Sequence, residues 1–294
     1  MEKNSVINPD QISELIEKLC KDGDNRLWPD SHEPAWDKPL VGFCRGDDPI
    51  FDHYKQVVGS FHWTPLEAFQ LAFPETPAKA EELGVVVWIL PQTEKTKRDN
   101  RVQDALPSER WARSRIFGEV FNSKLRERVS QELTESGFPA VAPMLLPDYG
   151  SVDSEKYIYA STWSERHMAH AAGLGTFGLC DGLITPAGKA MRVGSVVAKI
   201  SVPKTERPYA NHYKYCLFLS KGTCGLCIDR CPAGAISKSG HDKRKCRDYL
   251  NSHTRPYVTQ TFGFAGYGCG LCQTDVPCES EIPPPDGDME RIGD

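Results

Sequence analysis

The sequence predicts a layered domain of the α/β (α+β) class over residues 1–205, followed by a small cysteine-rich module over residues 206–294. Two observations carry this prediction. Apolar segments with strand-like and helix-like periodicity alternate through the first part, as expected where helices cover a sheet. The second part is rich in loops and cysteines and too poor in apolar residues to fold without a metal. We therefore expect two domains that meet near residue 205.

The first half of the layered domain contains one helix signal and one strand signal. Asp10 is a suitable N-cap for an amphipathic helix that ends at Gly23. Residues 84–91 (GVVVWILP) form a continuous apolar run bounded by Gly and Pro, which is typical of a buried strand. The short basic run at residues 95–101 (KTKRDNR) is interrupted by an acid, and we expect a solvated loop there.

The second half of the layered domain alternates helix and strand signals. Ser108 can cap a long helix that ends at Gly137. A second helix is expected at residues 163–172 and a strand at residues 192–200. This alternation is the main reason for the predicted fold class.

Charge and hydropathy exclude several classes of protein. The net charge of −5 and the pI near 5.9 argue against a chain built mainly to hold nucleic acid or an anionic membrane. No apolar run approaches the length of a membrane span. The first residues (MEKNSVINPDQ) resemble neither a secretory nor a twin-arginine signal, so we expect a cytoplasmic protein.

The eleven cysteines are distributed unevenly. Three of them, Cys20, Cys44 and Cys180, precede residue 216. The other eight are Cys216, Cys224, Cys227, Cys231, Cys246, Cys269, Cys272 and Cys278. Because cytosolic thiols are kept reduced, such a concentration indicates metal ligation and not disulfides.

The cysteine spacing is typical of a bacterial ferredoxin-like two-cluster module. Cys224, Cys227 and Cys231-Pro232 reproduce the end of the C-x2-C-x3-C-P run, in which the last cysteine binds the other cluster. A second C-x2-C block begins at Cys269. Eight thiolates are what two [4Fe–4S] clusters require, so we expect two such clusters.

The reciprocal pattern assigns Cys224, Cys227 and Cys278 to one cluster, and Cys231, Cys246, Cys269 and Cys272 to the other. The first set lacks a fourth ligand, because Lys221 stands where the standard run has a cysteine. We expect Cys216 to complete it, the alternatives being a three-ligand site or a ligand from Cys180. A zinc ribbon made from the two C-x2-C pairs would leave four cysteines unexplained, as well as the Cys-Pro ending.

A glycine-rich segment, Gly173-Leu-Gly175-Thr-Phe-Gly178, matches the dinucleotide-binding fingerprint letter for letter. That fingerprint requires a preceding strand, whereas a helix with a capping box at Thr162 and Glu165 is expected here. Gly173 then takes the place of a helix C-terminal glycine. We therefore expect no nucleotide site, and glycines that let the backbone approach something flat or crowded.

Three segments carry a family resemblance: residues 163–178 (WSERHMAHAAGLGTFG), 182–186 (GLITP) and 192–197 (RVGSVV). Together they resemble the core of epoxyqueuosine reductases and reductive dehalogenases, in which a similar glycine segment precedes a double-cluster module. The resemblance spans about residues 105–283. It implies that the α/β domain binds a corrinoid (cobalamin). The contacts it implies are Gly173, Leu174, Gly175, Gly178, Arg192 and Gly194.

The resemblance also implies a route for electrons and a source of protons. An external low-potential donor of the ferredoxin or flavodoxin type would reduce the clusters, and the clusters would reduce cobalt. Epoxyqueuosine reductases have an acidic proton donor at the position of Tyr159, and dehalogenases use a tyrosine. Tyr159 is thus the predicted catalytic residue, a tyrosine packed on a strand edge being the alternative. His167 and His170 could touch the corrin or the substrate, or be ordinary partly buried histidines.

Three functions remain open at this point. The first is a corrinoid-dependent reductase that acts on a small molecule. The second is a [4Fe–4S] electron-transfer protein without substrate chemistry of its own, and the third is epoxyqueuosine reduction on tRNA. The length of residues 1–205 favours an enzyme, because a carrier needs only the cysteine module. The acidic pI and the missing acidic donor lead us to expect a small-molecule substrate and no nucleic-acid partner.

Overall fold

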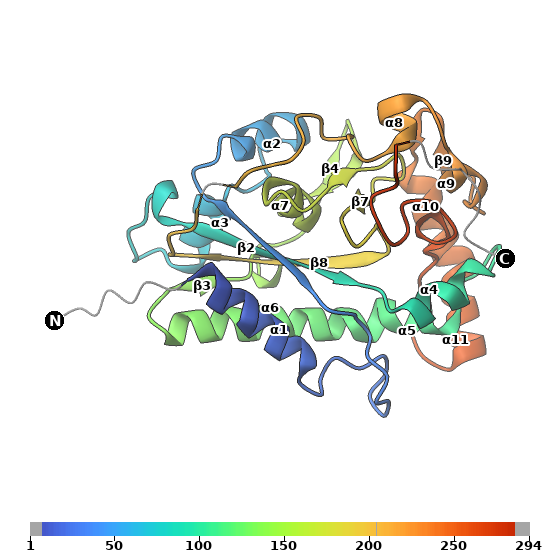
Figure 1. The fold of residues 1–294 in the computed structure, drawn as a ribbon, viewed down its shortest axis with the longest axis horizontal. Coiled ribbons are helices and arrows are strands. Elements are labelled where there is room, and N and C mark those ends of the chain that lie inside the picture. The colour runs from blue at the N-terminus through green and yellow to red at the C-terminus, as the bar shows by residue number, and fades with distance from the viewer. Residues whose placement is uncertain (1–7, 204, 286–294) are drawn as a thin grey trace.

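A four-stranded sheet lies between two helical layers in the computed structural model, which describes residues 8–203 and 205–285 (Figure 1). Its spatial order is β1-β2-β8-β3, and every neighbouring pair is antiparallel. The strands are β1 (Leu40–Arg45), β2 (Gly84–Pro91), β8 (Met191–Ala198) and β3 (Ala140–Val141). The predicted layered fold class is confirmed, and the antiparallel pairing makes it the α+β form.

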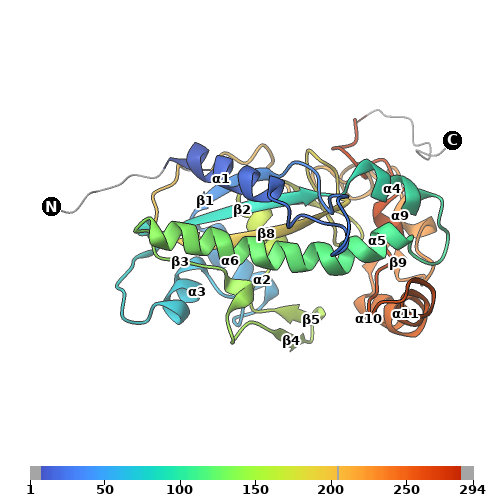
Figure 2. The ribbon, with the colours of Figure 1, turned by 90° about the horizontal axis from the view of Figure 1, so that it is seen from below.

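Strand β2 separates two hydrophobic cores. It is buried along its whole length, as its apolar run predicted, and its side chains alternate between the two faces of the sheet. Trp88 packs with α1 and α6 on one face, and Val87 packs with α2, α3 and α7 on the other. Figure 2 shows α1 and α6 lying along the first face. The helices are α1 (Pro9–Lys21), α2 (Ile50–Val58), α3 (Pro65–Ala72), α6 (Glu119–Glu135) and α7 (Glu165–Ala171).

The predicted helices are present, with two changes in detail. The N-cap of α1 is Asn8 and not Asp10, because the Asn8 side chain and Gln11 form a reciprocal capping box. The predicted long helix begins after Ser108 as α5 (Glu109–Arg113), passes through a π-helical turn at Ser114–Gly118 and continues as α6. This turn places Gly118 against the Trp36 ring, where a Cβ would leave too little room.

The run at residues 95–101 is not a solvated loop. It forms α4 (Glu94–Arg101), which packs against the cysteine module. Asn100 is fully buried, and its amide donates to the Thr274 hydroxyl at 3.1 Å. Arg101 pairs with the buried carboxylate of Glu279. The prediction failed because the alternating charges of this run serve partners that are distant in the sequence.

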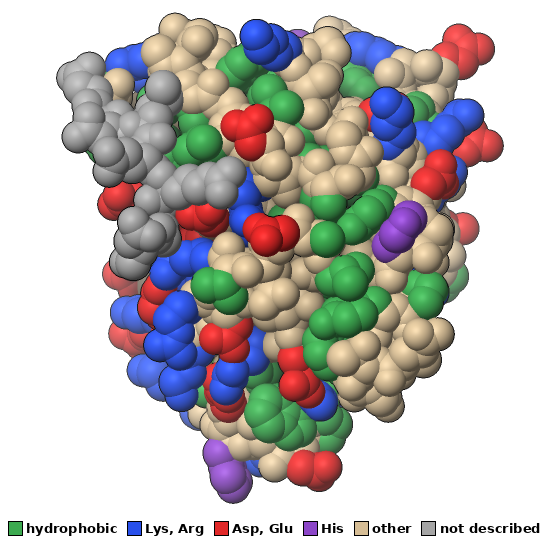
Figure 3. All heavy atoms as spheres, turned by 90° about the vertical axis from the view of Figure 1, so that its right-hand side faces the viewer, with side chains coloured by type: hydrophobic (Ala, Val, Ile, Leu, Met, Phe, Trp, Pro, Cys, Tyr) green, Lys and Arg blue, Asp and Glu red, His purple; other side chains and the backbone are tan. Residues whose placement is uncertain are grey.

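The cysteine module lies at one end of the molecule, beyond α4 and α5 (Figure 1). Figure 3 shows this end, where charges of both signs are interspersed with hydrophobic side chains. Its helices are α8 (Leu217–Lys221), α9 (Leu226–Asp229), α10 (Lys243–Tyr249) and α11 (Arg255–Phe262). None of the helices in the described part of the chain combines the length and apolar character needed to cross a bilayer.

Short elements complete the chain. In chain order, α7 follows the β4–β5 hairpin and precedes the β6–β7 pair. The β9–β10 hairpin precedes α10. The strands are β4 (Ser151–Ser154), β5 (Ile158–Ser161), β6 (Thr176–Phe177), β7 (Leu183–Ile184), β9 (Ile236–Ser237) and β10 (Gly240–His241). Single helical turns are Ala80–Glu82, Pro143–Leu145 and Leu271–Gln273, and a π-helical turn at Leu250–Thr254 joins α10 to α11.

Candidate functional site

Four cysteines line one small cavity in the module. They are the first predicted ligand set, which we call set A: Cys216, Cys224, Cys227 and Cys278. The rest of the lining is mostly apolar, and the N-terminus of α8 brings Cys216 to this cavity, so a longer loop does deliver it. The four thiols of set A therefore border the same cavity, and their assignment to one cluster stays a prediction.

The second predicted ligand set, which we call set B, consists of Cys231, Cys246, Cys269 and Cys272. Burial and the neighbouring thiols of Cys246 and Cys231 raise the pKa of Cys269 to about 12, so these three sulfurs share one environment. No group of three or more His, Cys, Asp or Glu side chains in the described residues is spaced to hold a single metal ion.

Cys180 lies between the two sets. Its thiol is buried and faces Cys227 of set A and Cys272 of set B. The Lys189 ammonium, itself only 3% exposed, donates to its sulfur at 3.5 Å. The sequence offered Cys180 as an alternative ligand, and this placement makes its substitution an informative control.

The glycine segment follows α7 as predicted. Gly173 has φ +74° and closes the helix, and its N–H donates to the His170 carbonyl. The space for a Cβ at Gly175 is taken by the Ile184 carbonyl oxygen, and at Gly194 by the Trp88 ring. These two glycines are therefore required by the internal packing of the chain, whatever else lies near them.

The other predicted corrin contacts also face the protein. Leu174 packs into the core beside Gly42. A Cβ atom at Gly178 would lie 3.4 Å from the Gly182 carbonyl oxygen. The Arg192 guanidinium pairs with the Glu119 carboxylate at 3.7 Å. These residues do not line the pocket described next.

A pocket of about 830 Å³ opens beside α7, within the size range of cofactor and ligand sites. It is lined by α2, the β4–β5 hairpin, α7, the segment 207–213 and the start of α10. Five of the eight histidines of the chain line it, together with five tyrosines. They are His53, His167, His170, His212 and His241, and Tyr54, Tyr157, Tyr159, Tyr209 and Tyr213.

His170 presents an unsatisfied nitrogen at this pocket. The ring is 7% exposed and stacks on Tyr209 with centroids 5.1 Å apart. Its Nδ1 is 2.7 Å from the Tyr54 hydroxyl, whereas its Nε2 has no partner among the described residues. Burial lowers the pKa of His170 to about 4, so the imidazole is neutral and can offer Nε2 to a ligand. Such a buried polar atom normally has a hydrogen-bond partner, so this nitrogen is a candidate contact for a ligand.

Tyr159 also lines the pocket, on β5. The Lys243 ammonium lies 5.5 Å from the centre of its ring, and the Arg247 guanidinium 5.2 Å. Burial, with the nearby Cys246 thiol, raises the pKa of Tyr159, so the phenol keeps its proton at neutral pH. Lys243 and Arg247 flank Cys246 on α10. This helix therefore joins the pocket to set B.

Helix α7, which carries the pocket histidines His167 and His170, is held by a buried ion pair. Thr162 and Glu165 do not form the predicted capping box: the N-cap is Ser164, and Glu165 turns into the core. Its carboxylate accepts from Arg126 Nε at 2.9 Å and from the Ser195 hydroxyl. The capping motif was misleading because Glu165 has a stronger partner in α6.

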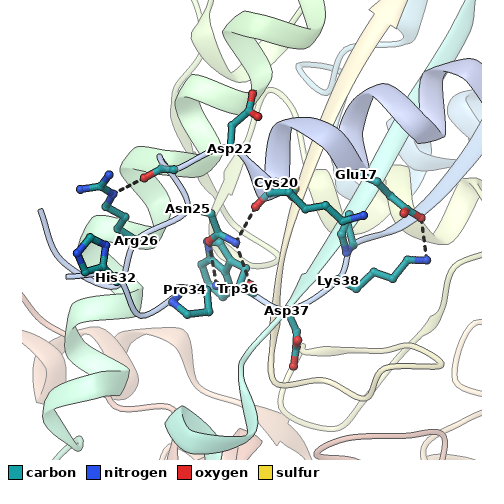
Figure 4. Close-up of a pocket in the computed structure, with 13 residues that line it drawn as sticks. Glu17, Cys20, Asp22, Asn25, Arg26, His32, Pro34, Trp36, Asp37 and Lys38 are labelled. Atoms are coloured by element: carbon teal, nitrogen blue, oxygen red, sulfur yellow. Dashed lines mark hydrogen bonds and ion pairs between the residues drawn. The ribbon is translucent and has the colours of Figure 1, made fainter.

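A separate hollow of about 430 Å³ lies at the end of α1 (Figure 4). Its polar groups largely satisfy one another: Asn25 bonds the backbone of Cys20 and Trp36, and Lys38 pairs with Glu17 at 3.0 Å. None of the predicted site residues lines it.

Most of the residues that line the pocket were not predicted from the sequence. Tyr54, Tyr209 and the pair His241 and Lys243 come from three separate segments, and none of these residues belongs to a motif. The available signal was weak: histidines and tyrosines are unusually frequent among the residues that line this pocket, but only the fold brings them together.

Comparison with known proteins defines the class. Residues 222–278 match the 4Fe-4S double cluster binding domain, which includes seven of the eight predicted ligands; Cys216 lies outside the matched range. The module is thus an iron–sulfur domain of the double-cluster kind, as predicted.

Curated relatives extend the comparison to the layered domain. An epoxyqueuosine reductase of Bacillus anthracis is 27% identical over 189 residues, covering 60% of this chain and 45% of the relative. One from Staphylococcus aureus is 27% identical over 190 residues with the same coverage. The matched segment thus spans less than half of these relatives.

Solved structures show the same fold. An epoxyqueuosine reductase solved with an epoxyqueuosine-modified tRNA stem loop is 17% identical over 96% of this chain and 70% of its own, with a TM-score of 0.50. A reductive dehalogenase is 15% identical over 83% and 30%, also with a TM-score of 0.50. The predicted resemblance to this group is confirmed. The expectation that excluded nucleic acid finds no support in these relatives.

Proposed function

We propose that this protein is a cytoplasmic, corrinoid-dependent iron–sulfur reductase. The observation that carries the proposal is the position of α10, which contributes Lys243 to the pocket and Cys246 to set B. A redox centre ligated by set B would therefore border a pocket large enough for a ligand. An electron carrier without substrate chemistry has no need of such a pocket.

In this proposal, sets A and B each bind one [4Fe–4S] cluster. All eight side chains are thiols, which are the ligands that such clusters take. The set A thiols already surround one cavity. Electrons come from an external low-potential donor of the ferredoxin or flavodoxin type, as the family resemblance implies.

The pocket residues fit a large, flat cofactor with polar groups at its edge. His170 Nε2 is a buried atom without a partner in the described residues, and the rings of Phe177 and Tyr209 provide flat apolar walls. We assign the corrinoid contacts to these residues; of the predicted glycine segment, only Phe177 lines the pocket in the described part of the chain. When bound, a corrinoid supplies a cobalt centre that is both a nucleophile and a reductant.

Tyr159 is the proposed proton donor. Its phenol is protonated at neutral pH and lines the pocket, so it can give a proton to a bound substrate. Lys243 and Arg247 lie close enough to stabilise the phenolate that remains. Tyr159→Phe is expected to lower kcat at least tenfold without changing iron content or cofactor affinity.

A bulky substitution tests the location of the cofactor. Ala160 lines the pocket on β5, and Ala160→Trp should reduce cobalamin affinity at least tenfold while leaving the iron content unchanged. The control is Ala265→Trp, an exposed position in the cysteine module. Gly175→Leu is unsuitable, because the Ile184 carbonyl would clash with any side chain there. Equal affinities for wild type and Ala160→Trp would place the cofactor elsewhere.

A second candidate is epoxyqueuosine reduction on tRNA. It is favoured by the names of the relatives and by a positive pocket mouth, where exposed Lys156, Arg166 and Arg247 lie near Tyr157 and Tyr159. A tRNA stem loop should then bind more weakly as the salt concentration rises. In Lys156→Ala the slope of log affinity against log salt concentration should fall by about one, which corresponds to one lost phosphate contact. Binding that is unaffected by salt or by this change would leave a small molecule as the substrate.

A further inference from the structure

Lys189 lies inside the cavity of set A and is the only charged side chain among the described residues that line it. The side chain is 3% exposed. Its backbone N–H donates to the carbonyl of Cys278, which fixes the residue beside this ligand. The sequence offered no reason to single it out.

The ammonium of Lys189 is committed to sulfur. It donates to Cys180 Sγ at 3.5 Å, and Lys189 lines the same cavity as Cys278. Glu279, the neighbouring acid, is paired with Arg101 instead. No carboxylate forms an ion pair with Lys189 in the part of the chain that the structure describes.

A buried ammonium without a carboxylate partner is costly unless other negative charge is present. Thiolates that ligate a cluster keep this negative charge, so Lys189 stays an ammonium beside the metal site.

We infer that Lys189 raises the reduction potential of the cluster held by set A. This inference rests on the proposed two-cluster site and not on the corrinoid. Reduction adds one electron to the cluster, supplied in the test by dithionite, with no bond formed or broken. Because the reduced cluster is more negative than the oxidised one, a buried ammonium in the same cavity favours the reduced state.

The test is a redox titration of reconstituted full-length protein, followed by electron paramagnetic resonance. Lys189→Met should make reduction of one cluster at least tenfold less favourable, which is 59 mV for a one-electron couple, with a smaller effect on the other. Lys189→Arg should keep the wild-type potential. The matched control is Lys221→Met, an exposed lysine next to set A in the sequence, which should change neither potential.

A second measurement uses the wild-type protein and so does not depend on whether the variant folds. Protein labelled with ¹⁵N only at lysine Nζ should show a weakly coupled nitrogen in pulsed resonance spectra of the reduced cluster. Two clusters with unchanged potentials in Lys189→Met, or no such coupling in labelled wild type, would overturn the inference. If reconstituted wild-type protein contains neither cluster, the two-cluster proposal itself is contradicted.

Discussion

The cysteine module and the pocket beside α7 are built in opposite ways. The module draws its eight candidate ligands from residues 216–278, and all are cysteines that include two C-x2-C blocks. The pocket draws its lining from residues between Ile50 and Lys243, with mixed chemistry and no regular spacing. A site whose geometry is set by local loops is therefore visible in a sequence, whereas one assembled by tertiary packing is not.

The two regions also handle charge differently. In the module, buried Lys189 faces sulfur, so its charge makes sense only if the thiols carry negative charge. Around the pocket, the buried charges of Arg126 and Glu165 neutralise each other and support α7. The module thus depends on its metal, and the pocket depends on its scaffold. Three predictions test this contrast.

The largest effect is expected for the iron content. Wild-type protein reconstituted without oxygen should hold about eight irons, and Cys216→Ala about four, because a cubane that loses a ligand from set A is lost. Iron analysis and electron paramagnetic resonance provide the measurement. Cys180→Ala is the control and should retain both clusters. An intact set A cluster in Cys216→Ala, with loss in Cys180→Ala, would show that Cys180 is the ligand.

The next largest effect concerns the scaffold of the pocket. Arg126→Met leaves the buried carboxylate of Glu165 without its ion-pair partner, so the free energy of unfolding should fall by about 3–5 kcal/mol. Arg128→Met on the same helix removes an exposed pair with Asp22 and should cost less than about 1 kcal/mol. Denaturant titration compares the two. Adding Glu165→Gln to Arg126→Met should recover part of the loss, and equal losses in the two single variants would contradict the account.

A smaller effect is expected from pH. The pKa of His170 is about 4 in the folded chain and near its ordinary value of 6.5 in the unfolded chain. The unfolded state therefore binds a proton first, and stability falls as pH drops from 6.5 to 4, by about 3 kcal/mol over the window.

Two histidine variants test whether His170 causes this pH dependence of stability. His170→Gln should lose less stability between pH 7 and pH 4.5 than wild type, measured by denaturant titration at each pH. His253→Gln, at an exposed position, should behave as wild type does. An unchanged pH dependence in His170→Gln would mean that another group is responsible.

The same contrast explains which parts of the fold and of the site could be predicted from the sequence. The buried strand at residues 84–91 and the helix after Ser108 were predictable because apolar runs and caps are local. The helix at Glu94–Arg101 was not, since its charges pair with Glu279 in the module. The sequence motif drew attention to Gly175, but it did not reveal why a glycine is needed there. The reason is the Ile184 carbonyl oxygen, which occupies the space of a Cβ and comes close only in the folded chain.

The most direct test of the central claim is a titration of anaerobically reconstituted wild-type protein with cobalamin, followed by visible absorption. The account predicts about one cobalamin bound per chain at micromolar concentration, with the spectral shift that marks loss of the lower ligand, in protein that already contains about eight irons. Full iron content without any affinity for cobalamin or a shorter corrinoid would contradict the reductase proposal and leave an electron carrier.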